Sequence, residues 1–158
     1  MTTLVNLAYR PLVTRTTRII KPVYETLAFL APVSDLLVRL WVANVFFKSG
    51  LTKFQSWDST VLLFTYEYQV PFLSPATAAL LGTAAELILP VLLALGLAGR
   101  LSAAALFVFN IIAVISYPDL MEAGLRDHQL WGILLLITLT HGPGKLSLDY
   151  MIGKYTQR

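Results

Sequence analysis

The chain contains no cysteine and few charged residues. Without cysteine it has no disulfides, no thiolate metal ligands and no dithiol redox chemistry, so any redox role needs a cofactor or a partner. Charged residues make up 13% of the 158 residues, hydrophobic residues make up 56%, and the mean hydropathy is +0.68. Too little polar surface remains to cover a water-soluble globule of this size, which predicts a membrane protein.

The sequence also has few residues that bind metal ions. Its two histidines, His128 and His141, lie thirteen positions apart, about 20 Å along a helix. That separation is too large for both to bind one metal ion or haem within a single chain. We therefore expect no metal site.

Four apolar stretches predict four membrane spans. Continuous apolar runs satisfy their backbone in lipid only as helices, so the predicted fold is an all-α integral membrane four-helix bundle. The fourth run is shorter than the ~20 residues that a span needs, so it either extends upstream through Leu125 or ends below the membrane surface. The expected spans are Val33 to Phe54, Ala76 to Ala98, Leu101 to Tyr117 and His128 to His141.

The chain divides into three expected parts. Residues 1–30 form a basic cytoplasmic segment, in which Pro11 interrupts any interfacial amphipathic helix. Residues 31–150 form the membrane domain, which opens at Pro32 with Ser34 and Asp35 as candidate capping residues. Residues 151–158 form a cytoplasmic tail. No small-residue cleavage site follows a short apolar core near the start, so the first segment is expected to be retained.

The distribution of basic residues predicts the orientation. Lysine and arginine gather in the N-terminal segment, at Arg100 and in the C-terminal tail, whereas residues 55–74 and 119–127 are acidic on balance. Both termini are therefore expected in the cytoplasm, with the chain in a bacterial inner membrane. Residues 56–71 mix aromatic and acidic residues, which predicts an interfacial segment between the first two spans. This segment either anchors the bundle or covers an outward-facing pocket.

Glu86 lies near the middle of the second apolar stretch. A carboxylate there costs roughly 2.5 to 3.5 kcal/mol on insertion scales, so it is expected to face protein and to have a partner. Helical rise places Asn44, Lys48, Asn110 and His128 at a similar depth, roughly 15 to 22 Å from the cytoplasmic side. Asn44 and Lys48 are four positions apart on one helix face, which makes a joint contact with Glu86 geometrically easy.

This polar layer has two interpretations. Its members either hold the helices in register through interhelical hydrogen bonds, or they form a site for a polar ligand, a quinone head group or a proton. Arg39 is expected to be a structural or snorkelling charge within reach of Asp35 on its own helix. His128, beside Asp127, is expected either to orient a ring nitrogen or to lie at a helix end.

The C-terminal sequence from Gly142 to Asp149 contains a helix stop. Gly142 and Gly144 can end the fourth helix while Pro143 prevents its continuation, and Ser147 or Asp149 can cap a short helix that follows. A docking surface for a cytoplasmic or membrane partner is the alternative interpretation.

Three motifs in order resemble the DoxX family of small four-helix membrane proteins. Arg39-Leu40 through Phe46, Gly50, Lys53 and Phe54 resembles the family's first helix, and Gly82 with Glu86, continuing to Arg100, resembles its second helix. The sequence Gly142-Pro143-Gly144-Lys145-Leu146-Ser147-Leu148-Asp149 is similar to its ending. The resemblance covers about Leu36 to Asp149. It transfers Arg39, Lys53, Glu86 and the Gly142–Asp149 motif as matched positions without assigned roles.

The resemblance implies fold more than activity. Family relatives include the small membrane subunit of a thiosulfate:quinone oxidoreductase and membrane partners of redox-protective enzymes. Residues 57–60, 66–71 and 127–132 resemble a subgroup encoded beside enzymes that modify metal-binding peptides. The expected function is therefore a non-catalytic membrane subunit or adaptor in a redox or metal-stress pathway. A quinone-interacting oxidoreductase subunit and a small-solute transporter are the alternatives.

The expected partners are the lipid bilayer and a membrane or cytoplasmic protein, with no nucleic acid. The sequence does not identify a cofactor, and a quinone is the candidate. Self-association is left open, because small residues on the second and third spans are common in membrane helices.

Overall fold

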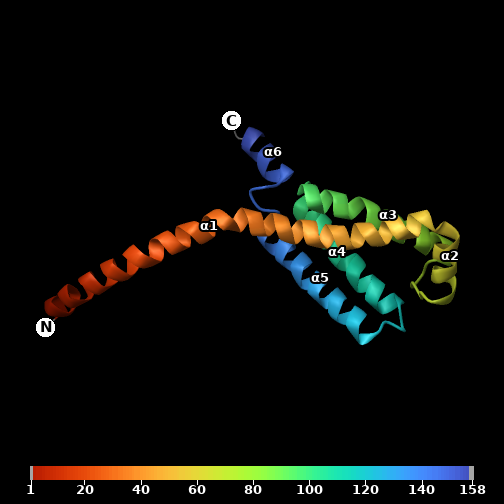
Figure 1. Ribbon diagram of the computed structural model, residues 1–158, viewed down its shortest axis with the longest axis horizontal. Coiled ribbons are helices and arrows are strands. Elements are labelled where there is room, and N and C mark those ends of the chain that lie inside the picture. The colour runs from red at the N-terminus through yellow and green to blue at the C-terminus, as the bar shows by residue number, and fades with distance from the viewer. Residues whose placement is uncertain (1, 157–158) are drawn as a thin grey trace. The chain divides into compact units, whose positions relative to one another are not determined.

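The computed structural model describes residues 2–156, with side chains from residue 20 onward. Within this part of the chain all regular structure is helical, which confirms the all-α prediction (Figure 1). Six helices follow one another along the described chain: α1 Thr2–Gln55, α2 Trp57–Tyr66, α3 Pro75–Leu95, α4 Gly99–Ser116, α5 Glu122–His141 and α6 Leu148–Thr156.

The chain forms two compact units, residues 1–34 and residues 35–158. In the first unit the described backbone is helical throughout and continues as α1, so Pro11 and Pro22 do not interrupt it. The prediction that a helix opens at Pro32 with a cap at Ser34 is also wrong, because Ser34 Oγ donates to the carbonyl of Ala31 within the helix. A proline removes one backbone hydrogen bond, and the neighbouring turns retain theirs.

Among the described residues, three helical segments are long and apolar enough to cross a membrane: Ile20–Gln55 of α1, Pro75–Leu95 and Gly99–Ser116. Ser74 is the N-cap of α3, and its Oγ accepts a hydrogen bond of 3.3 Å from Thr77 N. Gly96, in the left-handed conformation, is the C-cap of the same helix. Helix α5 extends upstream from the expected His128 to Glu122. Charged residues in its first two turns lower its hydropathy, so α5 is not among the three.

The core of the second unit lies where α1, α3, α4 and α5 meet. Its buried side chains include Val42, Phe46, Leu93, Leu106 and Leu135. The ring of Phe46 meets Phe109 and Trp131 edge to face, with centroids 6.2 Å and 5.7 Å apart. Aromatic pairs in this geometry add attraction beyond area burial, so Phe46 links α1 to both α4 and α5.

The predicted interfacial segment contains the short helix α2, which folds back onto the start of α3. Phe64 of α2 is buried against Ala78 and Ala79 of α3. The chain then continues through Tyr68, whose ring stacks on Phe64 at 4.7 Å and on Tyr117 at 5.0 Å. This segment therefore covers the end of the bundle where α3 begins and α4 ends.

Candidate functional site

Glu86 is paired with Lys53 of α1. Lys53 Nζ lies 2.8 Å from Oε1 and 2.7 Å from Oε2 of Glu86. Ser49 Oγ donates to Oε1 at 3.2 Å and accepts from Lys53 Nζ at 2.8 Å. Glu86 is buried and the Lys53 side chain nearly so. The pair removes the net charge that either group alone would leave in an apolar layer.

The expectation that Asn44 and Lys48 contact Glu86 is wrong. Both residues are exposed on α1, on the side turned away from the core. Arg39, Val42, Phe46 and Lys53 follow one another at intervals of three, four and seven residues and so share the face that packs on the bundle. Helical depth placed Lys48 near Glu86, but rotation about the helix axis decided which lysine reaches it.

Gly50 lets α1 approach α3 at this point. A Cβ atom on Gly50 would lie 2.8 Å from Glu86 Cβ and 3.0 Å from its carbonyl carbon. Only glycine tolerates backbones this close, as in other packed membrane helices. Gly50 therefore sets the distance over which Ser49 and Lys53 reach the carboxylate, and the sequence marked it only as part of the family motif.

A cavity of about 250 Å³ opens beside the ion pair. Lys53 and Glu86 form its polar end, and the other walls are mainly apolar side chains of α3, α4 and the segment after α2. We call it the Glu86 cavity. It is lined by Lys53, Phe64, Tyr68, Val70, Leu73, Ala78, Leu81, Gly82, Ala85, Glu86, Phe109, Ile112, Ala113 and Ser116.

Ser116 supplies a second polar group to the Glu86 cavity. The residue is 1% exposed, and among the described side chains its Oγ is one of three buried polar atoms without a hydrogen-bond partner. A buried hydroxyl without a partner loses the hydrogen bonds that it makes in water. Ser116 Oγ is therefore a hydrogen-bonding group at the cavity wall that no described protein group satisfies. No sequence signal pointed to this residue.

The segment between α2 and α3 closes one side of the cavity. Gln69 N donates to the carbonyl of Ser116 at 2.7 Å, and Tyr117 Oη donates to Glu67 Oε2 at 3.0 Å. Burial raises the pKa of the Tyr68 phenol, and the negative charge of Glu86 raises it further. Tyr68 therefore stays a neutral phenol in the cavity wall.

Asn110 and His128 form a separate pair between α4 and α5. His128 Nδ1 lies 2.7 Å from Asn110 Oδ1, and Asn110 Nδ2 donates to the carbonyl of His128 at 3.0 Å. Among the described residues no hydrogen bond links this pair to Glu86. The predicted five-residue layer is therefore two pairs, Lys53–Glu86 and Asn110–His128, with Asn44 and Lys48 outside both.

Arg39 is a structural arginine, buried to 1% exposure. Nη1 donates to the carbonyls of Leu93 at 3.1 Å and Ala94 at 2.6 Å, and Nη2 donates to the carbonyl of Leu146. The guanidinium thus binds two carbonyls in the last turn of α3, of which that of Leu93 also accepts from Gly96 N at 3.1 Å. Asp35, which the sequence places within reach on the same helix, forms no ion pair with Arg39 among the described residues.

The Gly142–Asp149 motif ends α5 and connects three helices. Gly142 and Gly144 have positive φ angles of 93° and 79°, and Ser147 Oγ caps α6 by accepting from Tyr150 N at 3.2 Å. Asp149 instead caps α4, accepting from Ala98 N at 2.8 Å and Gly99 N at 2.7 Å. The helix stop and the Ser147 cap are confirmed, whereas Asp149 serves another helix.

Comparisons with known proteins agree with this architecture. The DoxX family model matches residues 34–118, more than half of the chain. A curated protein of Haemophilus influenzae, described as an uncharacterized protein, is 34% identical over 131 residues, which cover 77% of this chain and 85% of that protein. No solved structure gives a significant match. The family match and the three apolar helices together show that this chain is a membrane protein of the DoxX family.

Proposed function

We propose that this protein is a multi-pass subunit of the bacterial inner membrane that binds the ring head group of a quinone in the Glu86 cavity and so supports a redox pathway. The observation that carries the proposal is the cavity itself, an apolar chamber with a buried, fully paired Lys53–Glu86 couple at one end and an unpaired Ser116 hydroxyl in its wall. Mostly apolar walls with a few placed polar groups are typical of small-molecule sites.

In this proposal α5 is the fourth span, and both termini lie in the cytoplasm. Helix α5 packs along α4 and contributes the buried residues Gly132, Leu135 and Thr138. Its twenty residues match the ~20 that a crossing requires. The basic residues at the α3–α4 turn and after α5 support the cytoplasmic assignment of that end.

The size and polarity of the cavity suit one substituted ring. An apolar cavity of about 150 Å³ is enough to hold benzene, so 250 Å³ accommodates a larger, substituted ring. The lining runs from Ala78 to Glu86 on α3 and from Phe109 to Ser116 on α4, about 10 to 12 Å of helical rise. A 1,4-quinone hydrogen-bonded at both carbonyls needs donors roughly 11 Å apart, since each hydrogen bond adds about 2.8 Å to a separation of roughly 5 Å between its oxygens.

Each of the two quinone carbonyls has its own hydrogen-bond donor in this proposal. All three protons of Lys53 Nζ are used by Ser49 and Glu86, so in this proposal a quinone carbonyl replaces one of these hydrogen bonds. The ammonium then also stabilises the negative charge that develops on that oxygen during reduction, and Ser116 Oγ donates to the other carbonyl. Reduction to the quinol takes two electrons and two protons. In this proposal the electrons come from a redox partner subunit. Lys53 and Glu86 deliver one proton to the carbonyl oxygen beside them, and the second proton comes from water at the other carbonyl oxygen.

Binding of decylubiquinone to the protein in nanodiscs tests the proposal, with menaquinone analogues measured in parallel. Substituting both members of the pair, Lys53→Met with Glu86→Met, removes the donor without leaving a buried unpaired charge. We expect this variant to bind at least tenfold more weakly. Ser116→Ala is expected to weaken binding about two- to tenfold, the effect of one hydrogen bond. Lys48→Met is the matched control, because Lys48 lies outside the cavity, and it should bind as the wild type does.

Two outcomes contradict the proposal. One is a folded wild-type protein that binds no quinone analogue, and the other is equal binding by the cavity variants and Lys48→Met. If the protein purified gently from its own membrane carries a protein partner but no small molecule, the adaptor function replaces the quinone-binding function.

A further inference from the structure

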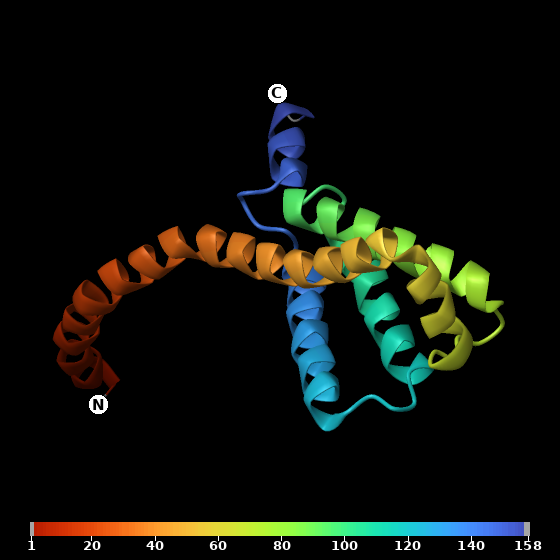
Figure 2. The same cartoon turned by 45° about the vertical axis from the view of Figure 1, so that its right-hand side comes forward.

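Helix α6 is attached at the end of two candidate spans. Asp149 N donates to the carbonyl of Gly96 at 3.0 Å, and its carboxylate accepts hydrogen bonds from Ala98 N and Gly99 N. These contacts fix the first turn of α6 beside the α3–α4 turn. In the unit of residues 35–158, this turn lies at the opposite end from α2 (Figure 2). The helix therefore begins beside the ends of two candidate membrane spans.

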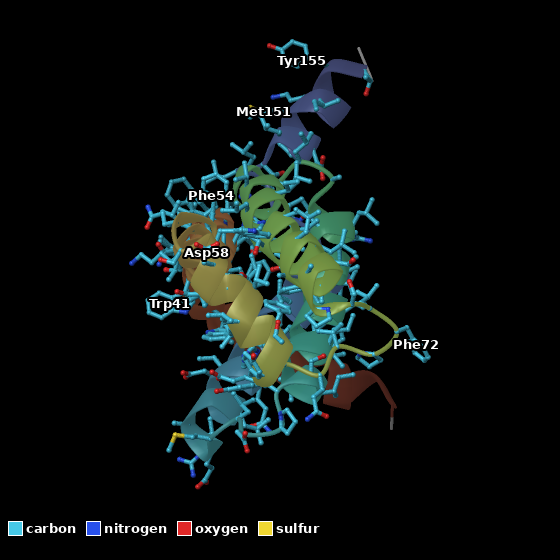
Figure 3. All side chains as sticks on the ribbon, turned by 90° about the vertical axis from the view of Figure 1, so that its right-hand side faces the viewer. Trp41, Phe54, Asp58, Phe72, Met151 and Tyr155 are labelled. Carbon is cyan, nitrogen blue, oxygen red and sulfur yellow. The ribbon has the colours of Figure 1, made fainter. Side chains whose placement is uncertain are left out.

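One face of α6 is apolar and uncovered. Leu148, Met151, Ile152 and Tyr155 follow the i, i+3, i+4, i+7 spacing of an amphipathic helix. Met151, Ile152 and Tyr155 are 49%, 51% and 79% exposed, and no residue of α6 is buried. Figure 3 shows the Met151 and Tyr155 side chains projecting outward from this end of the unit.

Lysine and tyrosine side chains lie beside the apolar face of α6. Lys145 and Lys154 line a groove of about 370 Å³ together with Tyr150, Met151 and Tyr155. The neighbouring carboxylate of Asp149 is already engaged by the two backbone amides at the start of α4. The groove thus presents two ammonium groups and two phenols, the donors that bind phosphate oxygens.

We propose that α6 and Lys145 bind the anionic phospholipid head groups of the leaflet at this end of the protein. The apolar face of α6 enters the boundary between head groups and acyl chains, and the two lysines contact lipid phosphates. A protein partner is a poorer match, because a nine-residue helix is about 13 Å long and offers on the order of 130 Å², against about 800 Å² per partner in a stable interface. Lipid binding by α6 and Lys145 does not depend on whether the Glu86 cavity holds a quinone.

The absence of cysteine makes a site-specific test direct. Ile152→Cys places a fluorescent label on the apolar face of α6. Gly153→Cys is the matched control, because a Cβ at Gly153 meets nothing within 4 Å and the helical spacing puts it on the opposite face. Each labelled protein is reconstituted into nanodiscs of phosphatidylcholine, alone or mixed with phosphatidylglycerol, and quenching by doxyl-labelled lipid reports contact with the bilayer.

We expect lipid quenching at residue 152 only in the discs that contain phosphatidylglycerol, with little quenching at residue 153. Lys145→Gln with Lys154→Gln should shift the equilibrium away from the lipid-bound position about 30-fold, since each lysine near an anionic surface contributes about fivefold. Equal quenching with and without phosphatidylglycerol overturns the proposal, as does a label at 152 that stays in water in every disc. If the label at residue 152 leaves water only after host membrane proteins are added, α6 binds a protein partner, and the lipid-binding proposal is overturned.

Discussion

Replacing Lys53 by methionine removes the cation from the pair that holds Glu86 between α1 and α3. Both carboxylate oxygens contact Lys53 Nζ, at 2.8 Å and 2.7 Å, and the two side chains are 13% and 8% exposed. Removing one partner of a buried ion pair costs about 3 to 5 kcal/mol, because the remaining charge stays desolvated. Ser49 still donates to Glu86, so we expect the lower end, about 3 kcal/mol.

The double variant Lys53→Met/Glu86→Met separates this penalty from the net contribution of the pair. Hydrophobic replacements of both members of a buried ion pair are often neutral or stabilising, so the double variant should unfold within about 1 kcal/mol of the wild type. The free energy of unfolding in mixed micelles, measured by steric trapping or denaturant titration for the wild type, Lys53→Met, Glu86→Met and the double variant, provides all four corners of the double-mutant cycle.

Lys48→Met is the control for the single substitution, since Lys48 is exposed five positions earlier on the same helix. Its effect should stay within about 0.5 kcal/mol, the usual range for surface substitutions. If Lys53→Met costs no more than Lys48→Met, the ion pair is not shielded from water, and the interpretation of Glu86 as a buried, paired acid is refuted.

Three further substitutions and one matched control test the packing of the bundle. Gly50→Ala places a Cβ 2.8 Å from Glu86 Cβ and should destabilise the folded protein by about 1 to 3 kcal/mol. Its control is Gly153→Ala, which has open space around it and should be neutral or stabilise the protein by up to about 1 kcal/mol. The unfolding midpoints of the two variants are compared with that of the wild type. Asp149→Ala removes the cap from α4 and should cost about 1 to 2 kcal/mol, seen as faster amide hydrogen exchange at residues 98 and 99. Arg39→Lys loses the planar fork that reaches carbonyls of α3 and of Leu146 and should cost about 2 kcal/mol, with greater proteolysis of the C-terminal segment as an independent measure.

The sequence by itself determined the properties that depend on local composition. Runs of about 20 apolar residues form helices in lipid wherever they occur, because no other conformation satisfies the backbone there. Ser74 and Pro75 at the start of α3, and Gly142 at the end of α5, act through the dihedral angles and hydrogen bonds of their own turns. Glu86 was also identifiable as a buried acid that needs a partner, because its cost depends only on its depth.

Local signals were less reliable where neighbouring elements compete. Pro32 and Ser34 resemble a helix start, yet α1 continues through them, because a single proline costs less than ending a helix inside an apolar run. Asp149 resembles a cap for the helix that contains it, but the amides of α4 lie within reach. The sequence does not indicate that the Asp149 carboxylate accepts hydrogen bonds from amides about fifty residues earlier in the chain.

Only the tertiary structure decided which residues share the site with Glu86. Helical rise determines depth from sequence, but the rotation of α1 about its axis depends on how its side chains pack against α3, α4 and α5. Phe46 in the aromatic core and Gly50 against the α3 backbone select the face that carries Ser49 and Lys53. That rotation leaves Asn44 and Lys48 outside, and the return of the segment after α2 closes the cavity in which Ser116 lies.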